Sequence, residues 1–265
     1  MTDRFLDDRA DLIAELKAAL GFLTRVPPRW FGFTGEPAVP VSSAARAFPA
    51  AGALIGLAGA LVYALAAVLT LPPLVAAGAA IAVAAALTGA LHEDGLADTA
   101  DGFGGGTTAE AKLAIMRDSR IGTYGATALM LAILLRAGLI AGLGADSALS
   151  VVFALVAAEA VSRGAMVAVW QALPAARPGL STTAGEPDET ARNGALVLAS
   201  GIGFAFGTFA VGPIGALVGL LGVVLAMLGF ARLAEAQIGG RTGDTLGAAQ
   251  QIALIVFLTL LLAFD

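Results

Sequence analysis

The sequence predicts an all-α, polytopic membrane protein of about seven transmembrane helices, folded as a single domain over residues 1–265. Of these residues 58% are hydrophobic and only 13% are charged, and the uncharged stretches are long. Soluble globular proteins carry about 25% charged and about 45–50% apolar residues. A helix needs about 20 apolar residues to cross the bilayer core. A soluble core does not explain so many runs of this length.

Seven candidate spans follow from the uncharged runs. The run 47–91 is divided at Pro72-Pro73, because a helix does not normally continue through consecutive prolines. The run 193–231 is divided in the same way at Gly212-Pro213. The predicted spans are therefore 47–71, 74–91, 121–144, 149–170, the two halves of 193–231, and 245–264.

The basic residues predict the orientation of these spans. The segments 1–46, 92–120, 171–194 and 232–247 fall on one side and contain thirteen of the fifteen Lys and Arg residues. By the positive-inside rule this side is cytoplasmic, and it includes the N-terminus. We therefore expect a multi-pass protein of the inner membrane. The segment 1–46 includes amphipathic residues 12–23, which would lie either on the membrane surface or against the bundle.

Charge and cysteine content exclude several classes of function. A net charge of −5 argues against nucleic acid as a partner. The chain has no cysteine, so it has no disulfide framework, thiolate nucleophile or zinc–thiolate site. Its 34 glycines predict closely packed helices, because small residues let helix backbones approach each other in lipid.

The loop 92–120 carries the strongest candidate site. It contains six acidic residues, three basic residues and the only histidine of the chain. Asp94, Asp98 and Asp101 are spaced i, i+4 and i+7, which places them on one face of a helix. Because like charges there repel, a divalent cation would stabilise them, and oxygen ligands favour Mg²⁺, Mn²⁺ or Ca²⁺. The alternative is a solvated acidic helix end.

Two other polar patches could bind phosphate near such a metal. Arg117 and Arg120 flank Asp118, and arginines suit phosphate oxygens, although basic residues are expected at a cytoplasmic helix end anyway. In the segment 238–248, four glycines surround Arg241 and Asp244. This pattern predicts an anion-binding nest with an additional metal ligand. A plain turn explains Arg177-Pro178-Gly179.

Ionisable residues also occur inside the predicted spans. Arg136 and Glu159 lie at similar depths in neighbouring spans, which predicts an ion pair with a structural role. Arg163 lies one helical turn closer to the cytoplasm than Glu159, so it could instead reach the phosphate site.

The segment 92–102, with the sequence HEDGLADTADG, resembles the signature of the cobalamin synthase family, the adenosylcobinamide-GDP ribazoletransferases. Residues 116–125 and 239–248 resemble two further stretches of that family. Weaker matches are Arg46-Ala47-Phe48-Pro49 with Gly52, Ser162-Arg163 and Arg177-Pro178. Many members carry an acidic residue early in the last helix, where this sequence has Gln250-Gln251.

The resemblance implies a Mg²⁺-dependent membrane enzyme that joins adenosylcobinamide-GDP to α-ribazole, or to its 5′-phosphate, and releases GMP. Its implied metal ligands are Asp94, Asp98 and Asp101, completed by Asp118 or Asp244. Its implied substrate-binding residues are Lys112, Arg117, Arg120, Arg163 and Arg241. His92 would act as a general base or orient an aspartate. Implied partners are the corrinoid nucleotide, α-ribazole and lipid, with a second copy or other corrinoid-pathway enzymes as further candidates.

Two alternatives belong to other classes. Membrane phosphotransferases of the CDP-alcohol phosphatidyltransferase type also place spaced aspartates and a glycine on a helix that leaves the bilayer. In that class an Ala-Arg pair follows Asp-Gly, whereas here Leu96-Ala97-Asp98 follows, and release of CMP rather than GMP would distinguish it. A transporter would concentrate charges at mid-membrane, whereas this sequence concentrates them in the loops.

Overall fold

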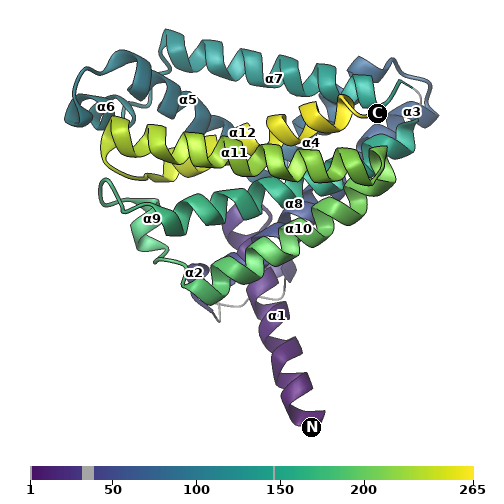
Figure 1. The fold of residues 1–265 in the computed structure, drawn as a ribbon, viewed down its shortest axis with the longest axis horizontal. Coiled ribbons are helices and arrows are strands. Elements are labelled where there is room, and N and C mark those ends of the chain that lie inside the picture. Colours follow the sequence, from purple (N-terminus) through teal and green to yellow (C-terminus); the bar gives the residue numbers. More distant parts are fainter. Residues whose placement is uncertain (1, 32–38, 146) are drawn as a thin grey trace.

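The computed structural model describes residues 2–31, 39–145 and 147–265, and within these residues every regular element is a helix (Figure 1). This confirms the predicted all-α class. Long helices run side by side across the molecule, and short helices and turns gather at the ends of this bundle.

Six segments of the described chain are long and apolar enough to cross a membrane. The first joins α2 (Val41–Ala44) and the 3-10 turn η2 (Ala45–Ala47) to α3 (Phe48–Val68). The others are α7 (Thr123–Leu143), α8 (Ala148–Ala172), α10 (Glu189–Val211), α11 (Pro213–Ile238) and α12 (Gly243–Leu262). A further segment consists of α4 (Pro73–Thr88) and α5 (Leu91–Gly105), joined at a 90° bend. The prediction of about seven spans is confirmed.

The bend between α4 and α5 places a polar helix beside the apolar spans. Gly89 and Ala90 have φ angles of 65° and 55°, a left-handed conformation that costs a non-glycine residue about 1–2 kcal/mol. The helix before the bend has no charged residue. The helix after it carries Glu93, Asp94, Asp98 and Asp101. We therefore treat α4 as the part within the membrane and α5 as a polar helix at its face.

The N-terminal helix α1 (Thr2–Leu23) projects from the bundle in Figure 1. Near its C-terminal end Ala18, Ala19 and Leu23 are buried. Glu15 accepts two hydrogen bonds from Arg46, at 2.8 and 2.9 Å. The structure thus shows the second alternative for this segment, in which the helix packs against the bundle. The 3-10 turn η1 (Pro28–Phe31) follows it.

The polar connections gather at one end of the molecule. The short helices α6 (Ala109–Ile115) and α9 (Leu180–Thr183) lie at the same end as the turn between α11 and α12, on the left of Figure 1. The C-terminus lies at the opposite end. The loops 92–120, 171–194 and 232–247, which were expected on one side of the membrane, therefore do lie together.

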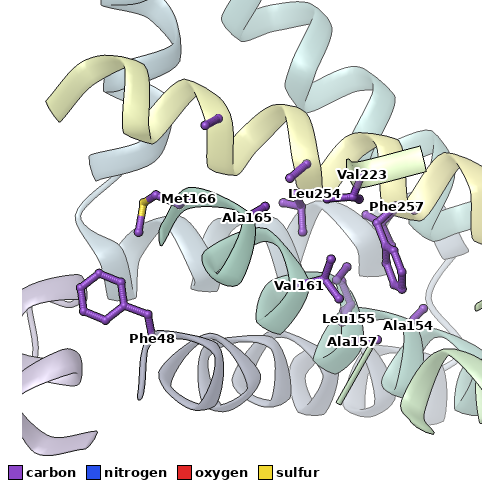
Figure 2. Packing of buried hydrophobic residues seen from close by; sticks show 14 of the residues in the cluster. Phe48, Ala154, Leu155, Ala157, Val161, Ala165, Met166, Val223, Leu254 and Phe257 are labelled. Carbon is purple, nitrogen blue, oxygen red and sulfur yellow. The ribbon is translucent and has the colours of Figure 1, made fainter. Parts of the chain in front are cut away.

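Helix α8 occupies the centre of the bundle, and Figure 2 shows its apolar side chains between those of the neighbouring helices. Glycines let α3 approach it closely: a Cβ atom on Gly56 would lie 2.5 Å from the carbonyl oxygen of Leu155. Phe48 and Met166 lie on the left of Figure 2 and belong to the same core. Close helix packing was expected from the glycine content.

A buried ionic network of Glu93, Arg136, Glu159 and Arg163 ties α5 to the spans. Arg136 Nη1 donates to Glu93 Oε1 at 2.8 Å, and Arg136 Nη2 lies 4.0 Å from Glu159 Oε1. Glu159 also accepts from Arg163 one turn further along α8. The predicted contact between Arg136 and Glu159 exists, but the closer partner of Arg136 is Glu93. Two positive and two negative charges balance, as a low-dielectric surrounding requires.

Two glutamines of α12 complete this network. Gln251 accepts from Arg136 at 3.1 Å and donates to Glu93 at 3.2 Å. Gln250 donates to Ser162 Oγ at 3.0 Å. A carboxylate at either position would add an uncompensated negative charge to a network that is already balanced. The network therefore gives a physical reason for uncharged glutamines at these two positions.

Breaking the network on one side should destabilise the protein strongly. Arg136→Met leaves Glu93 buried without its cation, so we expect a loss of about 3–5 kcal/mol of stability. The double variant Glu93→Gln/Arg136→Met keeps the Glu159–Arg163 pair neutral and should lose clearly less than the two single variants added together. Thermal unfolding in detergent measures both, with the exposed Arg232→Met as the control. Simple additivity of the two changes would contradict the network.

Candidate active site

A cavity that is partly open to solvent is lined by residues of α5, α8 and α12. Its polar lining includes His92 and Asp94 from α5, Arg177 from the loop after α8, and Asp244 from the first turn of α12. Aromatic and aliphatic side chains line the rest, among them Phe22, Leu23, Phe48, Leu91, Met166, Trp170, Leu180 and Leu246. The cavity therefore joins a charged part to an apolar part.

Two glycines bring the carboxylates of α5 and α12 together. A Cβ atom on Gly95 would lie 2.7 Å from the carbonyl oxygen of Asp244 and 3.1 Å from the Cα atom of Gly247. A Cβ atom on Gly247 would lie 3.2 Å from the Cα atom of Gly95. The backbones of the two helices are thus in direct contact beside the cavity. Side chains at these positions would push the helices apart.

Asp94 and Asp244 line the cavity, whereas Asp98 is not part of its lining; Asp98 interacts electrostatically with both, and the three are called the carboxylate cluster. Partial burial, followed by the charges of Asp94, Asp244 and Asp101, raises the pKa of Asp98 to about 7, and Arg177 opposes this shift. Asp244 accepts from Arg177 Nη2 at 2.9 Å and from Thr242 Oγ1 at 3.2 Å. The cluster is therefore short of positive charge, which a divalent cation would supply.

The described residues include no group of three His, Cys, Asp or Glu side chains arranged to hold a metal ion by themselves. Magnesium is usually held by one or two carboxylates together with phosphate oxygens of the substrate. The donor set of the cluster fits an ion of that kind, with substrate providing the missing ligands.

Asp101 lies on the same helix as Asp94 and Asp98 but has other partners. Its two carboxylate oxygens accept from the backbone N–H groups of Gly122 and Gly125, at 2.7 and 2.8 Å. These groups belong to the N-terminus of α7, where a negative charge is favourable. In this structure Asp101 caps α7, and its expected role as a metal ligand stays a prediction.

His92 is buried beside the charged part of the cavity. Burial, and then the charges of Arg163 and Arg136, lower its pKa well below 6.5, so its imidazole is neutral at pH 7. Its Nε2 atom is buried and has no hydrogen-bond partner within the described part of the chain. A neutral ring with a free nitrogen can hydrogen-bond to a bound hydroxyl.

Two expected substrate-binding arginines are buried outside the cavity lining. Arg241 donates to the carbonyl of Leu173 and, at 2.8 Å, to Glu186, and so joins the loop before α12 to the loop after α8. Arg163 belongs to the buried ionic network. Both have structural partners here, and their binding of substrate stays a prediction.

The remaining predicted residues lie at the surface of the loop 92–120. Asp118 accepts from Arg120, and this pair lowers the pKa of Asp118 to about 2. Arg117 is exposed. Lys112 donates to Gln237 of α11. None of these four residues lines the cavity within the described chain, and their expected roles stay predictions.

Sequence reasoning missed three residues of the cavity. Arg177 was explained as part of a turn, but it pairs with Asp244 across 67 positions of the sequence. Its occurrence in a weak family match was the one available signal. Trp170 and Ser181 were not singled out, because neither stands out in its own segment.

The sequence model of the cobalamin-5-phosphate synthase family matches residues 15–262. The chain belongs to this family. Proteins of Brucella anthropi and Brucella melitensis, both named adenosylcobinamide-GDP ribazoletransferase, are each 47% identical to it over 94% of this chain and 96% of their own length. No solved structure is significantly similar. The resemblance is confirmed, and the chain is a transferase of cobalamin biosynthesis with transmembrane helices.

The contact between α5 and α12 can be tested with one methyl group. Gly95→Ala should lower transferase turnover at least about tenfold, because the added Cβ displaces Asp94 and Asp98 from Asp244, and misplacement by about 1 Å can cost a hundredfold. Gly78→Ala in α4 is the matched control, because its Cβ would have no neighbour within 4 Å. Full turnover of Gly95→Ala would show that this contact does not position the site.

Proposed function

We propose that this chain is a Mg²⁺-dependent transferase that joins adenosylcobinamide-GDP to α-ribazole, or to its 5′-phosphate, and releases GMP. The relatives carry the name of this activity. In the proposed reaction a hydroxyl oxygen of the ribazole forms a bond to the phosphorus next to cobinamide. The bond from that phosphorus to the bridging oxygen breaks, GMP leaves with that oxygen, and the proton of the hydroxyl is released to water.

The observation that carries this proposal is the convergence of opposite charges on one cavity. The N-terminus of α12, residues 242–244, lines it, and a helix N-terminus attracts phosphate. Arg177 lines it as well and offers a guanidinium to phosphate oxygens. Asp94 faces these groups from α5. A diphosphate bound here would contact both an anion site and a cluster of carboxylates.

The carboxylate cluster would hold the metal. Asp94, Asp98 and Asp244 are the candidate ligands, because they interact electrostatically and Asp98 is short of a counter-charge. Bound Mg²⁺ supplies neutralisation of the diphosphate and of the charge that develops on GMP. Arg177 would stay beside Asp244 and orient its carboxylate while contacting phosphate.

His92 would orient the attacking hydroxyl. Because its imidazole is neutral and its Nε2 has no partner among residues 2–31, 39–145 and 147–265, it can accept a hydrogen bond from a ribazole hydroxyl. Phosphoryl transfer through a loose transition state depends mainly on positioning and charge neutralisation. A weakly basic histidine is therefore sufficient for this role.

We also propose that the site faces the cytoplasm from the inner membrane. The end of the bundle that carries the cavity is also the end rich in Lys and Arg, and the positive-inside rule favours the cytoplasm for it. Association with a second copy or with other corrinoid-pathway enzymes stays a prediction.

Removing one charge from the cluster should abolish the reaction. Asp94→Asn and Asp98→Asn should each lower GMP release at least about a hundredfold, the size of effect seen when electrostatic catalytic groups are lost. Chromatography of GMP from detergent-purified protein measures this. The exposed Glu189→Gln, on α10, is the matched control. Near-normal release from both aspartate variants would refute the assignment.

Chelation tests the metal directly. GMP release should fall to background in excess EDTA and return when Mg²⁺ or Mn²⁺ is added back, because hard oxygen ligands suit both ions. The thermal unfolding midpoint of the chelated protein should show that it stays folded. Activity that survives exhaustive chelation would exclude a metal-dependent mechanism.

A further inference from the structure

We propose that the apolar part of the cavity is a binding site for the planar heterocyclic base of a nucleoside substrate, with Trp170 and Ser181 as its hydrogen-bonding residues. This inference rests on the proposed function, in which both substrates carry such a base: the benzimidazole of α-ribazole and the guanine of the GDP group. It concerns how the substrate is held, separately from the chemistry at the carboxylate cluster.

Three aromatic side chains from three helices meet in this wall. The ring centroids of Phe22 and Phe48 are 5.8 Å apart and stacked, at an angle of 21°. Those of Phe48 and Trp170 are 6.0 Å apart, at 39°. All three residues line the cavity. Aromatic walls of this kind bind nucleobases, and each stacked base contributes about 1–3 kcal/mol.

Two buried polar atoms of residues in the same lining have no hydrogen-bond partner among the residues that the structure describes. They are Trp170 Nε1 and Ser181 Oγ, on residues only 2% and 4% exposed. Leaving a buried donor unpaired costs about 1–3 kcal/mol, and each such group calls for an explanation. Simple core packing would favour phenylalanine and alanine at these positions. The guanine of the GDP group, with the acceptors O6 and N7 on one edge, can satisfy both groups, whereas the single free ring nitrogen of the benzimidazole in α-ribazole can satisfy one of them.

The arrangement fits a base attached to a phosphate-bearing nucleoside. The aromatic wall and the charged part, with Asp94, Arg177 and Asp244, belong to one cavity. In such a nucleoside the ribose would connect the base, in contact with Trp170, to a hydroxyl or phosphate group near His92. The wall includes Phe22, so α1 contributes to the site as well as packing on the bundle.

The chain offers a direct probe, because Trp30 and Trp170 are its two tryptophans. Trp30 is 73% exposed and is not part of the cavity lining. In Trp30→Phe the emission comes from Trp170 alone, and in Trp170→Phe it comes from Trp30 alone. We expect saturable quenching by α-ribazole or by GMP in the first variant, with excitation at the red edge of the indole band. The second variant should show no saturable change, and ribose 5-phosphate should quench neither.

Steady-state kinetics then identify which substrate supplies the base. They also distinguish a substrate-binding role of Trp170 and Ser181 from a structural role. Trp170→Phe and Ser181→Ala should raise the KM for the quenching substrate about three- to tenfold, the effect of one lost hydrogen bond. They should leave kcat and the KM of the other substrate nearly unchanged. A merely structural role would instead lower kcat or affect both substrates.

The outcomes for the subsite and for the reaction can be distinguished. If Trp30→Phe releases GMP from the substrates but neither α-ribazole nor GMP quenches Trp170, the base site is wrong while the proposed reaction stands. If a base quenches Trp170 saturably but no GMP is released, the base site is supported and the proposed reaction is wrong.

Discussion

The structure depends on one constraint: two buried arginines and two buried glutamates must neutralise each other between the spans and the polar helix. An unpaired charge in such surroundings costs several kcal/mol, so Glu93 has to lie where Arg136 can reach it. That requirement, together with the bend at Gly89 and Ala90, holds α5 against α7 and α12. The neighbouring Asp94 and the following turn with Asp98 are then fixed at the membrane face. A network that looks purely structural therefore positions the carboxylates.

The geometry of the candidate active site follows from this position of α5. Because Gly95 and Gly247 allow backbone contact, the carboxylates of α5 meet the N-terminus of α12 and its Asp244. Partial burial, together with the negative charges of Asp94, Asp244 and Asp101, raises the pKa of Asp98. The protein offsets part of this repulsion with Arg177, and Asp101 is stabilised by the amides of α7. The carboxylate cluster therefore keeps a net negative charge and lies beside the N-terminus of α12, which attracts phosphate. This arrangement suits a metal-bound diphosphate.

Much of the fold and part of the candidate active site could be predicted from local sequence patterns. Uncharged runs, divided at Pro72-Pro73 and at Gly212-Pro213, predicted the spans, because crossing a bilayer imposes length and composition on each helix separately. The spacing of Asp94 and Asp98 predicted a shared helix face, because helical periodicity is local. The roles of Asp101, Arg177 and Trp170 could not be predicted in this way. Each depends on a partner from a distant segment, such as the α7 amides, Asp244 or Phe48, and no local pattern encodes which segments pack together.

The most direct test of the account is a cryo-electron microscopy structure of the protein in lipid nanodiscs with Mn²⁺ and GDP. The account predicts metal density on Asp94 and on Asp98 or Asp244, with the diphosphate between the N-terminus of α12 and Arg177. Metal and diphosphate bound instead at Asp118, Arg117 and Arg120, away from the cavity, would contradict it.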